Sequence, residues 1–249
     1  MIMYLWKCAY RTAETWRMMH RRGMMGRMEA AFKEQECLND GDISCISEEF
    51  NSLFGEKKFY FLCKRFFDVV VSAVGLAICA LPMLLIGALV RLDSEGPAIY
   101  AQERLGLNEK PFIMYKFRTM YLDAEANGPQ WAEKNDIRRT KVGIFLRKTR
   151  LDELPQFINI LKGEMSLVGP RPERAYFYNK FDETVPGFRR RMMVIPGVTG
   201  LAQVNGGYEL SPDEKLVYDM EYIRSQNFLL DLKCIVWTVK LVFTHKGAR

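Results

Sequence analysis

The longest apolar stretch of the chain covers residues 69–90, where 22 consecutive residues carry no charge. At 1.5 Å per residue, a helix of this length is about 33 Å long, which matches the roughly 30 Å hydrocarbon core of a bilayer. A core helix of a soluble domain rarely stays apolar on every side over such a length. The pattern therefore predicts a membrane-inserted helix, with a buried core helix as the alternative.

Proline 82 lies inside this apolar stretch. Its ring removes one backbone donor and clashes with the carbonyl of Ile78, so we expect the helix to kink there. Two arrangements are open: a bent helix that spans the bilayer, or a helix–break–helix hairpin that enters and leaves by the same face. Basic residues at both ends favour the hairpin slightly, because positive charge stays on the cytoplasmic side; they are Lys57, Lys58, Lys64, Arg65 and Arg91.

After residue 92 the pattern becomes that of a globular domain. Two strand-like stretches, 99–105 and 111–120, flank the turn-forming residues 106–110, which predicts a β-hairpin. The two-residue period of the second strand places Lys116 and Arg118 on one face.

Residues 228–243 are rich in apolar positions but include Asp231, Lys233 and Lys240. This pattern fits a helix lying in a membrane interface, with Trp237 as an anchor. It fits an ordinary core-packing helix equally well, so both interpretations stay open.

The composition indicates a folded protein: the chain has 249 residues, 49% of them hydrophobic, and a formal charge of +6. The small positive excess and the lack of a recognition-helix pattern argue against nucleic-acid binding. Six scattered cysteines without a C-x-x-C pair argue against a disulfide framework or a structural zinc site, and two histidines exclude multi-histidine chemistry. Any catalysis would use carboxylates, cations or an external metal ion.

The N-terminal 55 residues stand apart by their charge. Residues 1–28 carry six Lys/Arg against one acid, whereas residues 29–56 carry eight Asp/Glu against Lys33. An amphipathic surface arm, a targeting extension and a poorly ordered leader all fit this pattern. The absence of a long apolar core argues against a cleaved secretory signal, and we assign the segment no chemistry.

The most suggestive cluster is RKTRLDELPQ at residues 147–156. Proline is tolerated in the first turn of a helix, so Pro155 predicts a helix that begins at about Asp152 or Glu153. One interpretation is structural: Asp152 is an N-cap and Glu153 a first-turn acid. That interpretation does not explain the preceding cations. An ionised carboxylate among cations, with a divalent cation to bridge the remaining charge, is suited to attack on phosphorus.

Arg171 lies between Pro170 and Pro172. The two prolines restrict the backbone and so the direction of the guanidinium, whose planar fork suits bidentate phosphate contact. A solvated loop arginine is the alternative. The glycine-punctuated residues 196–207 match neither a Walker nor a Rossmann pattern and carry little weight alone.

Six motifs in this order resemble those of the bacterial sugar transferases, also called monotopic phosphoglycosyl transferases. They are KRFFD at 64–68 with its Pro-broken apolar helix, YKFRTM at 115–120, LDELPQ at 151–156, LVGPRP at 167–172, PGVTGLAQVNG at 196–206 and YDMEYI at 218–223. The resemblance extends from about residue 60 to the C-terminus. Six ordered motifs make it far more specific than any one of them would be.

The resemblance implies transfer of a sugar-1-phosphate from a UDP-sugar to a polyprenyl phosphate, usually undecaprenyl phosphate, with release of UMP. This reaction initiates membrane-linked glycan synthesis, such as that of exopolysaccharide, capsule, O-antigen or glycoprotein. Asp152 is then the expected nucleophile, and Glu153 its partner and a Mg²⁺ ligand. The residues expected to bind phosphate or nucleotide are Arg147, Pro170, Arg171 and Pro172 and, on weaker grounds, Lys116 and Arg118.

The fold implied by the resemblance is a helix-rich α/β monotopic membrane protein. Its parts are an N-terminal extension (1–55), a re-entrant membrane helix (56–92) broken at Pro82, and a catalytic domain (93–249) with a C-terminal interfacial helix. The expected location is the bacterial inner membrane, with the catalytic domain on the cytoplasmic face, and a homodimer is compatible with it.

Two positions depart from the family pattern. Leu81 precedes the membrane proline where relatives often have serine, and Gly207 stands where many have arginine. A function of another class is also open, a non-catalytic membrane adaptor that binds anionic lipids through the same cations. An Asp152→Asn variant would separate the two, because an adaptor does not need the carboxylate.

Overall fold

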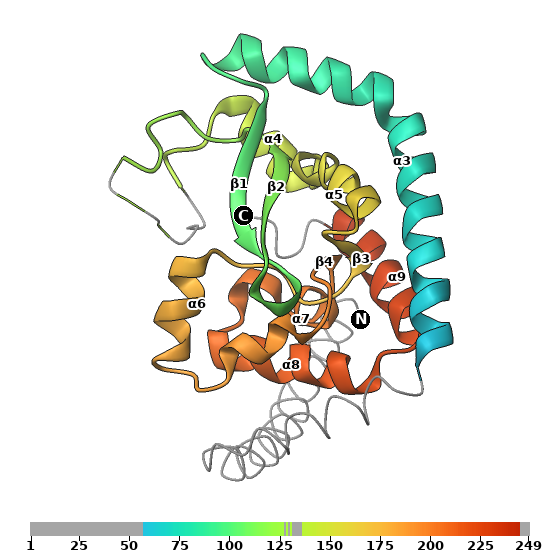
Figure 1. Ribbon diagram of the computed structural model, residues 1–249. Helices are drawn as coiled ribbons and strands as arrows, with labels where there is room; N and C mark the ends of the chain where they lie inside the picture. Colours follow the sequence, from blue (N-terminus) through green and yellow to red (C-terminus); the bar gives the residue numbers. More distant parts are fainter. Residues whose placement is uncertain (1–56, 127, 129, 131–135, 245–249) are drawn as a thin grey trace, which may run out of the picture. The chain divides into compact units, whose positions relative to one another are not determined.

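The computed structural model describes residues 57–126, 128, 130 and 136–244 (Figure 1). The predicted N-terminal extension, residues 1–55, lies outside them. The described part begins with one long helix and continues into a globular domain of short helices and small two-stranded sheets. This architecture agrees with the predicted helix-rich α/β class.

Helix α3 (Lys58–Asp93) contains the whole uncharged stretch and continues through Pro82. It bends sharply between its two ends (Figure 1), as expected of a helix that carries an internal proline. Within the described residues, α3 is the one helix long and apolar enough to cross a membrane, and its most apolar window is only 11% buried. The alternative of a buried core helix is therefore wrong. The large side chains that α3 exposes include Val74, Ile78, Leu81, Leu84, Leu85 and Leu89.

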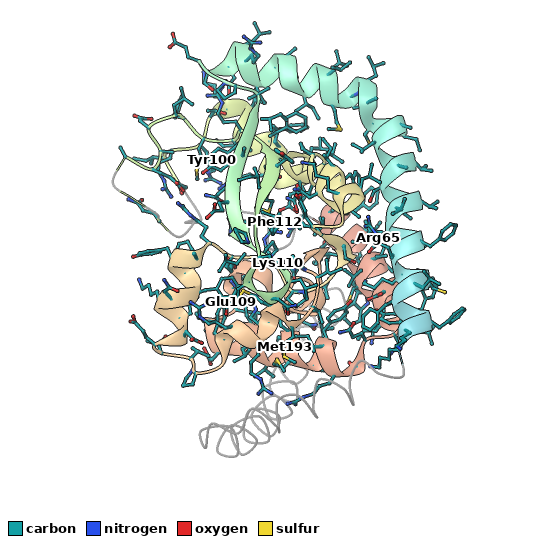
Figure 2. All side chains as sticks on the ribbon, in the orientation of Figure 1. Arg65, Tyr100, Glu109, Lys110, Phe112 and Met193 are labelled. Atoms are coloured by element: carbon teal, nitrogen blue, oxygen red, sulfur yellow. The ribbon has the colours of Figure 1, made fainter. Side chains whose placement is uncertain are left out.

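Both halves of α3 pack against the same globular domain. In the first half, the Arg65 guanidinium donates to the Ile160 carbonyl over 2.5 Å, and Figure 2 shows Arg65 between α3 and that domain. In the second half, Val90 is buried in an apolar cluster with Phe117 and Leu146. The bent helix thus returns to the domain that it leaves.

The predicted hairpin is present. Strands β1 (Ile99–Leu105) and β2 (Pro111–Phe117) pair antiparallel, with Ile99 opposite Phe117 and Leu105 opposite Pro111. The short 3-10 turn η1 (Leu107–Glu109) joins them. The second strand ends at Phe117 rather than at residue 120, so Arg118 lies just beyond it.

The remaining elements wrap around this hairpin (Figure 1). They are α4 (Lys141–Thr149), η2 (Leu151–Glu153), α5 (Gln156–Lys162), β3 (Ser166–Val168), α6 (Ala175–Asp182), η3 (Phe188–Met193), β4 (Gly197–Thr199), α7 (Leu201–Asn205), η4 (Gly207–Glu209), α8 (Pro212–Ser225) and α9 (Phe228–Thr244).

Strands β3 and β4 form a parallel pair whose ends approach very closely. A Cβ atom added to Gly197 would lie 2.1 Å from the backbone nitrogen of Gly169. No side chain fits at such a distance, so glycine is required for this approach. The contact fixes the segment that carries Arg171.

Helix α9 packs on the domain, as one of the two interpretations of residues 228–243 predicts, and the membrane interface of the other interpretation stays a prediction. One face packs on the domain and buries Asp231 and Cys234. The opposite face exposes an apolar stripe, which we call the α9 stripe, formed by Leu229, Leu232, Val236, Val239 and Phe243. Their spacing of three and four residues places them along one side of the helix.

Candidate active site

The two adjacent carboxylates lie on a tight turn between helices α4 and α5. Helix α4 ends at Thr149, and Arg150 then adopts the left-handed conformation, with φ 57° and ψ 17°. The following turn, η2, carries Asp152 and Glu153. A left-handed residue reverses the chain direction after a helix, so the carboxylates face back into the domain.

The helix after the carboxylates begins later than the sequence predicts. Pro155 predicts a start at Asp152 or Glu153, but α5 begins at Gln156. The Glu153 N–H donates to the Arg150 carbonyl over 3.3 Å, and this i to i+3 bond belongs to a 3-10 turn. Pro155 has no N–H with which to extend an α-helix backwards. The interpretation of Asp152 as an N-cap is therefore wrong.

A cavity of about 280 Å³, which we call the polar cavity, lies beside this turn, and Asp152 is part of its wall. Asp152 is only 8% exposed. Basic side chains outnumber acidic ones in the lining. The cations are Arg104, Lys116, Arg118, Arg138, Arg147, Arg150, Arg171, Arg174, Arg191 and Lys215, and the acids are Glu125, Asp152 and Glu173. Such a lining favours a ligand with several negative charges.

Glu153 is held by two of these cations. Its carboxylate accepts a hydrogen bond from the Arg171 guanidinium and lies 3.6 Å from the Lys116 ammonium. Burial disfavours the charged form, but Arg171 and Lys116 outweigh it and hold the pKa of Glu153 at about 2. Glu153 is therefore ionised at neutral pH, and its charge is compensated.

The pKa of Asp152 shifts in the opposite direction. Burial is the largest cause and the charge of Glu153 the next, and together they raise this pKa to about 6. Lys116, Arg147 and Arg171 act against the rise. The carboxylate is ionised at neutral pH, but it is more basic than an ordinary aspartate and so a better nucleophile.

The predicted Pro-Arg-Pro segment is anchored at each of its residues. The Gly197 N–H donates to the Pro170 carbonyl over 2.9 Å, and Arg104 donates to the Pro172 carbonyl over 3.1 Å. Arg171 itself reaches Glu153. The alternative of a solvated loop arginine is therefore wrong: the structure brings Arg171 to the carboxylate turn.

Arg147 and Arg118 also reach the polar cavity, but each has a partner in the fold. The Arg147 Nε donates to the Thr119 hydroxyl over 3.0 Å. Arg118 is buried and donates to three backbone carbonyls, those of Ser94, Glu95 and Pro97. Arg118 therefore holds the segment after α3, and three of the five N–H groups of its guanidinium are used in these bonds.

Sequence reasoning missed two buried ion pairs at the wall of the polar cavity. Arg191 pairs with Asp219 over 2.6 Å, and Arg104 pairs with Glu173 over 3.0 Å. Two signals were available, because Asp219 lies in the YDMEYI motif and Glu173 directly follows the Pro-Arg-Pro segment. The positions of Arg104 and Arg191 carry no such signal.

Comparison with known proteins identifies the family of the chain. The family model described as bacterial sugar transferase matches residues 59–245. The chain belongs to this family. Four of the six sugar-transferase motifs contribute side chains to the polar cavity, including Lys116, Asp152, Arg171 and Gln203.

Three curated sugar transferases illustrate the similarity. An Aeromonas hydrophila UDP-N-acetylgalactosamine-undecaprenyl-phosphate N-acetylgalactosaminephosphotransferase is 39% identical over 76% of this chain and 46% of its own length. A Klebsiella pneumoniae UDP-glucose:undecaprenyl-phosphate glucose-1-phosphate transferase is 42% identical over 74% of this chain and 41% of its own length. A Caulobacter vibrioides protein of the same name is 39% identical over 75% of this chain and 72% of its own length. The chain thus spans less than half of the first two relatives.

Proposed function

We propose that this protein transfers a sugar-1-phosphate from a UDP-sugar to undecaprenyl phosphate, releases UMP, and so initiates the synthesis of a membrane-linked glycan. The observation that carries the proposal is a buried, basic carboxylate, Asp152, in the wall of a cavity lined mainly by cations. The names of the relatives supply the substrate classes, a UDP-sugar and undecaprenyl phosphate.

In the first half-reaction, a carboxylate oxygen of Asp152 attacks the β-phosphorus of the UDP-sugar. The bond from this phosphorus to the bridging oxygen breaks, and UMP leaves with the electron pair. Arg147, Arg171 and Lys116 line the cavity where charge on the phosphate oxygens would otherwise repel the carboxylate. The product is an acyl phosphate that joins Asp152 to the sugar phosphate.

In the second half-reaction, a phosphate oxygen of undecaprenyl phosphate attacks the same phosphorus. The bond from phosphorus to Asp152 breaks, and the free carboxylate is regenerated. Glu153 stays ionised throughout, because Arg171 and Lys116 compensate its charge, and it holds these cations next to the reacting phosphorus. The sequence of two displacements gives ping-pong kinetics.

We further propose that Mg²⁺ takes part in the reaction and that Glu153 is its protein ligand. No group of three or more His, Cys, Asp or Glu that could hold a metal occurs within the described residues. Mg²⁺ commonly binds through one or two carboxylates together with substrate phosphates, so the neighbouring carboxylates fit an ion shared with the nucleotide. When bound, the ion would neutralise phosphate oxygens of the donor.

We also propose that α3 is a re-entrant anchor in the bacterial inner membrane, with the catalytic domain on the cytoplasmic face. The packing of both halves of α3 on one domain supports this arrangement, because a straight spanning helix would carry one end away from it. The α9 stripe supports a second contact with the membrane interface. A nucleotide sugar from water and a phosphate from the bilayer could then meet at one site.

The decisive experiment uses an Asp152→Asn variant. Detergent-purified protein is incubated with Mg²⁺, undecaprenyl phosphate and a panel of UDP-sugars, and UMP is measured. The wild type is expected to release UMP with at least one donor, and the variant to lose this activity by at least three orders of magnitude. The Asn variant should stay folded, because it removes a buried charge whose pKa is raised.

Glu183→Gln provides the matched control, because Glu183 is exposed and does not line the polar cavity. Mass spectrometry of wild type quenched with donor alone should find the sugar phosphate on the peptide that contains Asp152. An unmodified peptide together with full turnover by Asp152→Asn would contradict the proposal. A non-catalytic adaptor would give an unmodified peptide and no UMP release from either the wild type or the variant.

A further inference from the structure

A second cavity, which we call the apolar groove, lies beside the same carboxylate turn. Its volume is about 160 Å³. Asp152 lines the polar cavity, Glu153 lines the apolar groove, and Arg150 lines both. The rest of the groove is mainly apolar, and its walls are Leu154, Phe157, Val198, Thr199, Gln203, Val204, Thr238, Leu241 and Val242. The turn therefore separates two spaces of different chemistry.

Arg150 is the cation that lines the groove, and its guanidinium has no hydrogen-bond or ion-pair partner among the described residues. No hydrogen bond or ion pair joins its guanidinium to a residue in the described part of the chain, although its charge acts on Glu153 more weakly than Arg171 and Lys116 do. Glu153 is already compensated by those two cations. The half-buried charge of Arg150 is therefore available to an anion.

The backbone of Arg150 points to the same conclusion. Its φ of 57° lies in the left-handed region, where a residue other than glycine is strained. Glycine would fill this helix-end position without strain. A strained arginine at the junction of two cavities indicates that the side chain has a role there.

The apolar groove is continuous with the surfaces proposed to meet lipid. Leu241 and Val242 in its wall belong to α9, whose outer side carries the exposed Val239 and Phe243. At the other wall, the ring of Phe157 lies against Gly75 in the apolar stretch of α3. An apolar chain in the groove would thus pass directly to the two apolar helices.

We infer that the apolar groove binds the first isoprene units of the polyprenyl phosphate acceptor and that Arg150 binds its phosphate. This inference rests on the proposed function and adds which space each substrate uses. The groove offers apolar walls, one uncompensated cation and a compensated carboxylate, which match an amphiphile with a single anionic head. The donor binds in the polar cavity, where several cations face its two phosphates.

The assignment has a chemical consequence. The acceptor phosphate approaches from the groove side of the turn, and its oxygen attacks the phosphorus carried by Asp152. The new oxygen–phosphorus bond forms as the bond to the Asp152 carboxylate breaks. Donor and acceptor therefore need not exchange places in one pocket between the two half-reactions.

The test separates the two half-reactions. Exchange of labelled UMP into the UDP-sugar, measured without acceptor, reports the first half alone. Turnover with undecaprenyl phosphate in detergent micelles gives the KM for the acceptor. We expect Arg150→Ala and Arg150→Gly to raise the acceptor KM at least tenfold. Because Arg150 also lines the polar cavity, the exchange rate should fall as well, but by a smaller factor. Arg150→Lys should recover most of the affinity for the acceptor.

Lys148→Ala is the matched control, because it removes a neighbouring exposed cation that lines neither cavity. A second pair of variants tests the walls: Val242→Trp fills the groove and should raise the acceptor KM, whereas Ile137→Trp, at an exposed position that lines neither cavity, should not. If the acceptor KM were unchanged in Arg150→Ala and Val242→Trp while the wild type still exchanged UMP, the assignment of the acceptor to the apolar groove would be overturned and the proposed function would stand. Absence of exchange in the wild type would overturn the proposed function and this inference with it.

Discussion

At the residue scale, the site depends on two neighbouring carboxylates that differ in their surroundings. Glu153 pairs with Arg171 and Lys116, and its pKa falls to about 2. Asp152 is buried beside that charge, and its pKa rises to about 6. Neighbouring groups whose pKa values are driven apart are typical of residues with different chemical roles. One carboxylate holds the cations, and the other reacts.

The pH dependence of the first half-reaction follows from the pKa of Asp152. Protonated Asp152 cannot attack, so kcat/KM for the donor should rise tenfold per pH unit below about pH 6 and level off above it. Lys116 lowers this pKa, so in Lys116→Met the rise of kcat/KM with pH should occur at higher pH than in the wild type. Donor–UMP exchange between pH 4.5 and 9 measures both profiles.

Lys162→Met is the control for that shift, because Lys162 lies on the surface at the end of α5 and lines neither cavity. Its profile should match the wild type. If the pH profile of Lys116→Met coincided with that of the wild type, the conclusion that Lys116 lowers the pKa of Asp152 would be contradicted.

At the element scale, the parallel pair β3–β4 fixes the segment that carries Arg171. Gly197 and Gly169 approach so closely that their backbones would collide with any added side chain. The Gly197 N–H also bonds to the Pro170 carbonyl. The guanidinium of Arg171 is thus positioned by backbone contacts from a strand that is 26 residues away in the sequence.

Gly197→Ala should therefore destabilise the domain and impair the site. Overpacking a rigid contact costs about 1–3 kcal/mol, which corresponds to a fall in Tm of about 3–10 °C for a domain of this size. Differential scanning fluorimetry in detergent and UMP release measure the two effects. In Gly87→Ala, the control, the new Cβ would lie 3.7 Å from its nearest neighbour, so little change in Tm is expected. Equal Tm values for both variants would contradict the argument.

Helix α3 makes a second prediction at this scale, on membrane topology. Phe59→Cys and Leu92→Cys place thiols at its two exposed ends, and Leu84→Cys places one in its exposed middle. In a cysteine-free background, a re-entrant helix predicts that both end positions react with an impermeant maleimide from the same side of sealed vesicles. The middle position should be protected from either side. Labelling of the two ends from opposite sides would show a spanning helix instead.

At the scale of the whole molecule, much of the fold could be predicted because its signals are local. The uncharged stretch predicts α3, and the alternating residues predict the β1–β2 hairpin. LDELPQ predicts a helix here, but its start at Asp152 or Glu153 is wrong, because α5 begins at Gln156. The register of a hairpin and the period of a helix depend on residues that are close together in the chain. They can therefore be predicted from a single sequence.

The rest depends on contacts between distant residues. The pairing of Arg191 with Asp219 and the approach of Gly197 to Gly169 join segments that no periodicity connects. The left-handed conformation of Arg150 was also unpredictable, because glycine is the residue typical of that position. That conformation ends α4 directly before the 3-10 turn that carries the two carboxylates.

The excess of cations around the polar cavity has a consequence for the resting protein. Among the described residues, ten basic side chains and three acidic ones line the cavity, and some of the cations pair with acids outside the lining. The remaining positive charge should attract small anions from the medium before any donor arrives. The nucleotide must then compete with those anions for the cations of the cavity. The apparent affinity for the donor should consequently weaken as ionic strength increases, whereas the uptake of an uncharged sugar would be insensitive to it.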